Sequence, residues 1–354
     1  MKLLLISVKS EISKGGIAVW TNMFLKQCSS CGIDCDLVNT EVVGKRLKKG
    51  VFMLNLKDEY VRTRRIFRDL KKALRNNKYD VVHMNTSCGT FGLFRDYIAA
   101  KRVHKRGIPL VLHFHCDVPF WITNRFSKAC LKKLVKLSCE NIVLCENSRK
   151  YLLEQMDVEA QIIPNFVEED IIKAEAKEIK EKVEQIFFVG RIERKKGAAE
   201  MFELARRLPE ITFKLAGNVS DEVGAWEIPS NLELMGSVPH AHVIQTLDES
   251  DLFLFPSHSE GFSLALAEAM ARGVPSVATD VGANADMLSG GCGVITEVGD
   301  IDAMEKAIKS LRDTGARREA SKNALEKVKR EYRADKAIEK IKEAYINKEP
   351  HMRR

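Results

Sequence analysis

Two glutamates within residues 255–282, FPSHSEGFSLALAEAMARGVPSVATDVG, have the side chains and spacing that most clearly predict chemistry. Glu260 and Glu268 stand on either side of a loop-to-helix junction. The apolar spacing predicts a helix over Ser263–Arg272, which ends at Gly273. The N-terminus of this helix would direct unpaired backbone N–H groups at the space beside Glu260, which suits an anion. A carboxylate beside an anion site predicts a ligand that carries both hydroxyl groups and phosphate.

The elements that would position these residues are apolar strands that alternate with helical stretches, twice along the chain. In the first half we expect strands at Lys2–Val8, Asp36–Asn39, Val81–Met84, Leu110–His115 and Asn141–Cys145. In the second half we expect them at Gln185–Val189, Thr212–Ala216, Leu232–Met235, Leu252–Phe255, Ser276–Ala278 and Gly293–Ile295. Such alternation indicates parallel sheets that are covered by helices on both faces.

The predicted fold class is therefore α/β, with two doubly wound Rossmann-like domains that face each other across a cleft. We expect the first domain over residues 1–168 and the second over residues 169–330, with a C-terminal helical segment, 331–354, packing back on the first. Ligands in such sheets bind outside the carboxyl ends of the strands.

Length and composition exclude several classes of protein. The chain has 354 residues, which is long enough for two domains that each bury a core. No apolar run approaches the ~20 residues that a membrane span needs, and the first strand is too short for a signal-peptide core. Nine cysteines without the paired spacing of a zinc site indicate free thiols in a reducing cytoplasm. We expect a cytoplasmic protein without a bound metal.

Positive charge is concentrated in the first half of the chain. Residues 1–165 hold 29 Lys and Arg against 15 Asp and Glu, whereas the remainder holds 28 against 34. The basic residues cluster at Lys45–Lys49, Arg62–Arg75 and Lys128–Lys136. They form either solvated helix faces or a surface for anionic lipid or a polyanionic substrate. No nucleic-acid motif is present, so we expect no nucleic-acid partner.

An apolar segment, Phe120–Ile122, precedes the last of these basic clusters. It is consistent with three alternatives, which are a contact with a bilayer interface, a lid over a bound substrate and ordinary core. The first alternative predicts peripheral association with the inner face of a membrane through the N-terminal domain.

Several landmarks stand in a fixed order along the chain and carry a resemblance. They are Gly15-Gly16, His115, Ile163-Pro164-Asn165, Gly190-Arg191 with Lys196-Gly197, Ala216-Gly217, and the block from Glu260 to Glu268. In this the chain resembles family 4 of the retaining glycosyltransferases, which have the GT-B fold, along almost its whole length. The last block is the most specific landmark, because its Glu, Glu, Ala, Gly and Pro residues are spaced together.

The resemblance implies a metal-independent hexosyltransferase that needs no cofactor. It implies transfer of a sugar from a UDP- or GDP-sugar to a hydroxyl of a saccharide or lipid-linked acceptor, in the synthesis of cell-surface polysaccharide or glycolipid. The N-terminal domain would bind the acceptor and the C-terminal domain the donor.

In the segment that begins at Gly190, Arg191 and Lys196 would converge on the diphosphate of the donor. Guanidinium offers a forked pair of charge-assisted hydrogen bonds and ammonium a compact charge. Both would stabilise the negative charge that grows on the departing diphosphate. The alternative is that Arg191 and Lys196 pair with carboxylates on the helix surface.

The resemblance implies that Glu260 accepts hydrogen bonds from hydroxyls of the transferred sugar. Glu268 would hold the ribose hydroxyls, since both carboxylate oxygens can accept from a vicinal diol. Backbone N–H groups of Gly261, Phe262 and Ser263 would bind the phosphate.

On the acceptor side, the resemblance implies that His115 touches the donor sugar near the reacting carbon. His113, two residues earlier, is expected to be structural. Gly15 and Gly16 would let backbone approach the diphosphate or the acceptor closely. Asn85-Thr86-Ser87, after the third strand, is expected to line the acceptor pocket.

The segment Gly282–Asp286 departs from the family pattern and leaves the identity of the donor sugar open. Two alternatives from other classes share the fold. One is a sugar-nucleotide epimerase, which would need acid and base residues in another arrangement. The other is an inactive carbohydrate-binding scaffold, although such a protein is expected to lose residues such as His115, Arg191 and Lys196, which are all present.

Overall fold

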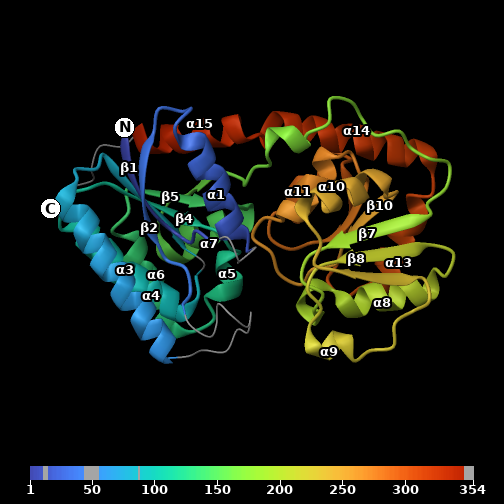
Figure 1. The fold of residues 1–354 in the computed structure, drawn as a ribbon, viewed down its shortest axis with the longest axis horizontal. Coiled ribbons are helices and arrows are strands. Elements are labelled where there is room, and N and C mark those ends of the chain that lie inside the picture. Colours follow the sequence, from blue (N-terminus) through green and yellow to red (C-terminus); the bar gives the residue numbers. More distant parts are fainter. Residues whose placement is uncertain (11–14, 44–55, 87, 347–354) are drawn as a thin grey trace. The chain divides into compact units, whose positions relative to one another are not determined.

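The computed structural model describes residues 1–10, 15–43, 56–86 and 88–346, which form two compact units (Figure 1). Unit 1 comprises Met1–Pro164 and the C-terminal segment from Asp335, and unit 2 comprises Asn165–Ala334. Each unit holds one six-stranded parallel sheet with flanking helices. The predicted α/β class with two Rossmann-like units is thus confirmed. The basic cluster Lys45–Lys49 and residue Ser87 lie outside the described residues.

The sheet of unit 1 has the strand order β2-β1-β3-β4-β5-β6. Its strands are β1 (Lys2–Ser7), β2 (Asp34–Asn39), β3 (Val81–Thr86), β4 (Leu110–Phe114), β5 (Glu140–Val143) and β6 (Gln161–Ile162). Its helices are α1 (Gly16–Cys28), α3 (Leu56–Asn76), α4 (Thr90–His104), α5 (Val118–Trp121), α6 (Arg125–Val135), α7 (Glu146–Met156) and α15 (Ala334–Ile346).

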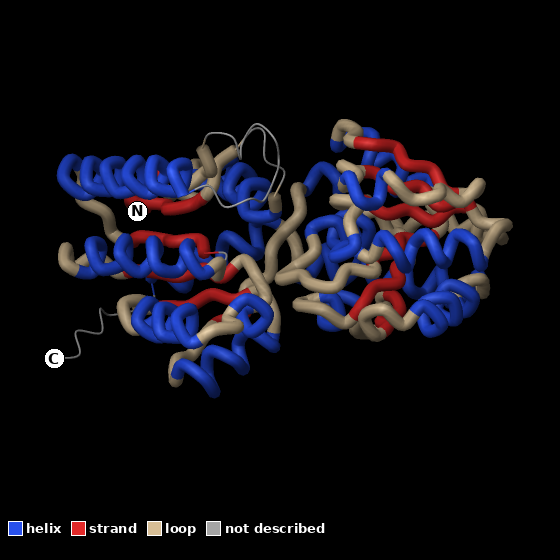
Figure 2. The backbone as a smooth tube through the Cα atoms, turned by 90° about the horizontal axis from the view of Figure 1, so that it is seen from below, coloured by secondary structure: helices blue, strands red, loops and turns tan. Residues whose placement is uncertain are grey.

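The strand order of unit 1 determines which face each helix covers. The connection from β1 to β2 runs across the sheet in the opposite direction to the later connections, so right-handed crossovers place α1 and α3 on opposite faces. Helices α3, α4 and α6 lie side by side on one face (Figures 1 and 2). Because both faces are covered, the central strands are continuous apolar runs, and Leu3, Leu4 and Leu5 are completely buried.

The sheet of unit 2 has the order β12-β11-β10-β7-β8-β9. Its strands are β7 (Gln185–Val189), β8 (Thr212–Ala216), β9 (Leu232–Gly236), β10 (Leu252–Phe255), β11 (Ser276–Thr279) and β12 (Gly293–Thr296). Its α-helices are α8 (Ala198–Arg207), α9 (Asp221–Gly224), α10 (His240–Glu249), α11 (Leu264–Ala271), α12 (Asn284–Leu288), α13 (Ile301–Ser310) and α14 (Thr314–Glu331). Two short 3₁₀ turns, η1 (Glu169–Ile171) and η2 (Arg194–Lys196), complete the unit.

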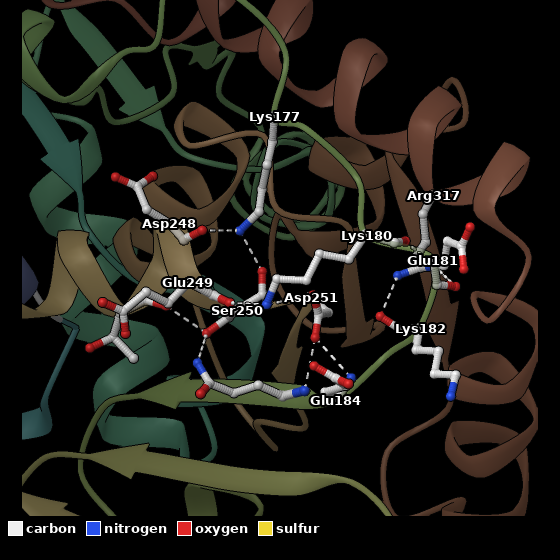
Figure 3. Close-up of polar contacts among 12 residues, drawn as sticks. Lys177, Lys180, Glu181, Lys182, Glu184, Asp248, Glu249, Ser250, Asp251 and Arg317 are labelled. Atoms are coloured by element: carbon white, nitrogen blue, oxygen red, sulfur yellow. Dashed lines mark hydrogen bonds and ion pairs between the residues drawn. The ribbon is translucent and has the colours of Figure 1, made fainter.

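Polar contacts fasten the charged segment that leads into β7 (Figure 3). The Lys177 ammonium donates to carbonyls at the C-terminus of α10, those of Leu247 at 3.0 Å, Asp248 at 2.5 Å and Ser250 at 2.5 Å. Burial lowers the pKa of Lys177 to about 8. Arg317, which is 1% exposed, donates to the carbonyls of Lys180, Glu181 and Lys182. Asp251 accepts from the backbone N–H groups of Glu184 and Gln185 at 2.8 and 2.9 Å, so β7 is anchored where it begins.

Most predicted strands agree with the structure within two residues, but the two-residue strand β6 was not predicted. The predicted helix over Ser263–Arg272 is α11, and Ser263 and Arg272 are its N-cap and C-cap. Across the described ranges, no helix is both long and apolar enough to cross a membrane.

Candidate active site

The predicted site residues of unit 2 gather at the carboxyl edge of its sheet. Strands β11, β10 and β7 are neighbours, and residues 280–284, 256–263 and 190–197 follow them in turn. Because the strands are parallel, these three loops emerge at the same edge, where ligands bind in open α/β sheets.

Two glycines allow these loops to touch. Gly197 and Gly282 have φ of +80° and +56°, in the left-handed region that favours glycine. A Cβ at Gly197 would lie 2.3 Å from the Pro256 carbonyl oxygen, and one at Gly282 would lie 2.3 Å from the Glu260 carbonyl oxygen. The backbone around Glu260 is therefore held from both sides by loops that have no side chain at the contact.

Lys196 and Glu260 form an ion pair between the loop at residues 190–197 and the loop at residues 256–263. Their side chains are only 19% and 14% exposed, so the pair is mostly shielded from solvent. Two predicted catalytic residues that are far apart in the sequence thus meet at the sheet edge.

Arg191 also has a carboxylate partner. Its guanidinium forms two contacts with Glu193, at 3.0 and 3.1 Å, and its side chain is 52% exposed. This is the alternative expected from the sequence, pairing with a nearby carboxylate. Arg191 nevertheless lies two residues beyond the end of β7, on the same loop as Lys196.

One residue pair at this edge was missed by the sequence reasoning. The His258 Nε2 atom lies 2.6 Å from Oε1 of Glu200, whose side chain is almost fully buried on α8. The His258 backbone N–H donates to the Lys195 carbonyl at 2.9 Å. These contacts join the loop that carries Glu260 to the loop that carries Lys196. In the sequence, the one feature that could have indicated a role for His258 was its position two residues before Glu260.

The start of α11 is built as the sequence predicted. The Ser263 hydroxyl accepts a hydrogen bond from the Leu266 N–H at 3.1 Å, so Ser263 caps the helix. The buried Phe262 ring packs against Tyr332 with ring centres 5.3 Å apart. These contacts fix the backbone of Gly261 and Phe262 before the helix.

Glu268 lies in the second turn of α11 and is paired with a residue that the sequence reasoning missed. His240, the first residue of α10, places Nε2 3.0 Å from Oε1 of Glu268. This hydrogen bond raises the pKa of His240. Glu268 is 18% exposed, so its carboxylate faces partly toward solvent. Nothing in the spacing of His240 indicated this contact.

In unit 1, His115 directly follows β4 at the carboxyl edge of the first sheet. Its ring lies 4.0 Å from the His113 ring and 5.0 Å from the Trp20 ring, measured between centres. Its ring nitrogens are buried and have no hydrogen-bond partner among the described residues. Burial lowers the pKa of His115 to about 3, so the imidazole is neutral near pH 7. Contact with a sugar would require the ring to turn out of this cluster.

Asn85, which was expected to line the acceptor pocket, belongs to a buried hydrogen-bond chain at the end of β3. Its amide Nδ2 donates to the Ser7 hydroxyl at 2.8 Å, and its Oδ1 lies 2.9 Å from His83 Nε2. His83 Nε2 must therefore donate, which leaves Nδ1 to accept from the Tyr345 hydroxyl at 2.6 Å. Ser7 continues the chain to Thr21 on α1 at 2.6 Å. The network thus ties α15, β3, β1 and α1 together.

The predicted glycines at the start of α1 differ in their roles. Gly15 is the N-cap, and its carbonyl accepts from the N–H groups of Ala18 and Val19. No described atom lies within 4 Å of a Cβ built on Gly16, so packing against the described residues does not require a glycine there.

No group of three or more His, Cys, Asp or Glu side chains among the described residues is arranged to hold a metal ion.

Comparisons with known proteins agree with this architecture. A family model described as Glycosyltransferase Family 4 matches residues 14–171, and one described as Glycosyl transferases group 1 matches residues 169–328. The sucrose-phosphate synthase of Thermosynechococcus elongatus has a similar fold, with a TM-score of 0.80, 15% identity and 98% of each chain covered.

Two curated relatives are similar over about two thirds of the chain. A 2-deoxystreptamine N-acetyl-D-glucosaminyltransferase from Niallia circulans is 27% identical over 268 residues, which are 67% of this chain and 68% of that protein. The UDP-Gal:alpha-D-GlcNAc-diphosphoundecaprenol alpha-1,3-galactosyltransferase of Escherichia coli is 26% identical over 283 residues, 69% of each chain. Since the two family models follow one another across the two units, the chain belongs to the family 4 (group 1) glycosyltransferases and has their GT-B fold.

Proposed function

We propose that this protein is a retaining, metal-independent hexosyltransferase that uses a UDP- or GDP-sugar. The acceptor is a hydroxyl of a saccharide or a lipid-linked saccharide, in the synthesis of cell-surface polysaccharide or glycolipid. The Lys196–Glu260 pair beside the start of α11 carries this proposal, because it sets a cation and a hydroxyl-binding carboxylate against one helix N-terminus. The name of the E. coli relative, with its UDP-linked donor and lipid diphosphate acceptor, supports these substrate classes.

The residues of unit 2 would bind the donor and stabilise its leaving group. Lys196 and Arg191 would contact the diphosphate, each exchanging part of its contact with Glu260 or Glu193 for phosphate oxygens. Glu260 would then accept hydrogen bonds from hydroxyls of the sugar, and Glu268 from the ribose. The fixed cations would lower the barrier as charge develops on the diphosphate.

The chemical step would take place on one face of the sugar. The bond from the anomeric carbon to the phosphate oxygen breaks, and its electron pair goes to the diphosphate. The acceptor hydroxyl oxygen bonds to the anomeric carbon on that face, and its proton passes to the departing phosphate oxygen. His115, neutral because of its lowered pKa, would contact the sugar without adding charge.

A donor screen tests this proposal. Purified protein is incubated with UDP- and GDP-hexoses in the presence of EDTA, and hydrolysis or transfer is followed by NMR, which also reports the anomeric configuration. We expect turnover with retention for one donor, and a loss of roughly 100-fold or more in kcat for Lys196→Ala. Lys195→Ala is the matched control, since Lys195 is the exposed neighbour on the same turn. Donor epimerisation, a requirement for metal, or an inverted product would each contradict the proposal.

We also propose peripheral association of unit 1 with an anionic membrane. Five aromatic residues on α4, α5 and α6 are about half exposed, namely Phe91, Phe94, Phe120, Trp121 and Phe126. The sequence of α6, RFSKACLKKLV, contains three lysines and an arginine but no acidic residue. Ile122, by contrast, is 8% exposed and belongs to the core, so only part of the predicted apolar segment is available.

Liposome flotation tests this association. We expect recovery with vesicles that contain phosphatidylglycerol to exceed recovery with phosphatidylcholine alone, and Trp121→Ala with Phe126→Ala to reduce it. Equal recovery with both vesicle types would contradict the proposed membrane association. The proposed transfer reaction would be unaffected by that result.

A further inference from the structure

A groove between α3 and α4 of unit 1 is lined by more cationic side chains than nearby carboxylates can balance. Its volume is about 810 Å³. Six of its lining residues are cations, Arg64, Arg68, Lys71, Arg102, Lys105 and Arg106, and the lining contains no carboxylate. The remaining lining residues are Tyr60, Thr63, Phe67 and Leu74. We call this the α3/α4 groove; the two helices that form it lie side by side in Figure 1.

The same helix pair also shows how this protein treats arginines that have a structural role. Near the start of α3, Arg62 contacts Glu59 at 3.2 Å, and Arg95 on α4 contacts Asp96 at 3.0 Å and Glu59 at 3.5 Å. Two arginines there are balanced by two carboxylates in a largely buried cluster. Of the six groove cations, Arg68 forms an ion pair with Asp69, at 2.9 Å. The other five form no ion pair with another described residue. The groove thus retains a large excess of positive charge.

Two of the groove arginines are positioned by backbone rather than by carboxylates. The Arg102 guanidinium lies 4.0 Å from the centre of the Phe67 ring and donates to the Phe67 carbonyl at 3.4 Å. Arg106 donates to the Leu74 carbonyl at 2.7 Å. Because a guanidinium has five N–H groups, each of these contacts leaves several donors for a ligand. The arginines are held in place while keeping their full charge, which suits bidentate binding of phosphate.

The groove lies away from the predicted reaction site. Helices α3 and α4 run antiparallel to the strands they connect, so their C-terminal ends lie at the amino edge of the sheet. The groove is lined by α3 from its second turn to near its end, and by the last turn of α4 and the residues after it. Gly15, Gly16 and His115 lie at the opposite, carboxyl edge.

We propose that the α3/α4 groove is a binding site for a phosphate-bearing ligand, separate from the donor site. The arginines and lysines bind at least two phosphate charges, and the apolar surface of Phe67 and Leu74 takes an uncharged part of the ligand. The same chemistry is found in a soluble diphosphate compound and in the headgroups of an anionic bilayer. The site does not depend on the proposed transfer reaction, because no groove residue has a role in it.

The experiment measures binding on the full chain in two arms. In the first, isothermal calorimetry follows inorganic diphosphate; in the second, flotation follows vesicles of phosphatidic acid in phosphatidylcholine. Both arms compare the wild type with Arg102→Gln/Arg106→Gln. The matched control is Lys72→Gln/Lys78→Gln, which removes the same charge from exposed positions that do not line the groove. The variant Arg191→Gln/Lys196→Gln removes the two cations of the predicted donor site and so tests whether the ligand binds there instead.

We expect the groove variant to lose about tenfold or more in affinity in at least one arm, while the lysine control and the unit 2 variant keep the groove binding event. Loss in the first arm indicates a soluble phosphate ligand, and loss in the second arm alone indicates a lipid headgroup. An equal loss in the groove variant and the lysine control would show diffuse charge attraction and overturn the proposal. Absence of binding in both arms would also overturn it, as would binding that only Arg191→Gln/Lys196→Gln abolishes.

Discussion

Replacement of Gly282 by alanine should perturb the loop that carries Glu260 without touching any charged group. Gly282 has φ of +56°, and its missing Cβ would lie 2.3 Å from the Glu260 carbonyl oxygen and 2.6 Å from that of Gly261. Both contacts are with backbone, so no flexible side chain can move aside. The loop itself must shift.

Two costs add in this variant. A residue with a Cβ in the left-handed region is destabilised by about 1 kcal/mol, and the overlap with backbone costs roughly 1–3 kcal/mol more. To restore an ordinary van der Waals distance, the Glu260 carbonyl must move by about 1 Å. A displacement of this size at a reacting group costs on the order of 100-fold in rate.

Gly299→Ala is the matched control. Gly299 has φ of +77°, and no described atom lies within 4 Å of a Cβ built there, so it incurs only the backbone cost. We expect urea unfolding to show a loss of about 1 kcal/mol for Gly299→Ala and about 2–4 kcal/mol for Gly282→Ala. Sugar transfer, measured well below the unfolding transition, should fall on the order of 100-fold only for Gly282→Ala.

Equal kcat and KM values for the two folded variants would refute the reasoning. They would show that the position of the Glu260 backbone does not matter for turnover, and the proposed role of Glu260 would then lose its geometric support.

Three further predictions concern buried polar groups. Burial lowers the pKa of His83 to about 4, so the unfolded chain binds a proton between pH 6.5 and 4 that the folded chain does not; stability should therefore fall by about 2 kcal/mol between pH 7 and 4.5 from this residue. His83→Gln should remove that part of the decrease in urea titrations, and an unchanged decrease would assign it to other groups. Tyr345→Phe leaves His83 Nδ1 without its donor and should cost about 1–3 kcal/mol of stability; a smaller loss than for an exposed substitution on α15 would be inconsistent with the hydrogen-bond chain. In a double-mutant cycle, Lys196→Met and Glu260→Gln should show a coupling of about 1–3 kcal/mol, because the pair is mostly but not fully buried; additive effects on unfolding would mean that the pair does not contribute.

The positions of the strands along the chain were largely determined by the sequence. Strands β7, β8 and β10 begin and end where the apolar runs predicted, because a parallel strand that is buried on both faces must be apolar throughout. The limits of α11 also follow from local chemistry, since Ser263 caps one end and Gly273 stops the other. Strand β6 has only two residues, which is too short for any periodicity to indicate it.

The same local signals placed Lys196 and Glu260 on loops that follow two strands, but only the tertiary structure made those strands neighbours. The partners of Glu268 and Glu200 were also decided there, since His240 and His258 come from elements remote in sequence. Three other features also depend on how helices and loops pack together. They are the burial of the His115 ring, the close approach of Gly282 to Glu260 and the cationic groove. Periodicity and capping are properties of a few consecutive residues, and they determine elements. Contacts between side chains of different elements depend on the distance and rotation at which those elements pack, which no short stretch of sequence encodes.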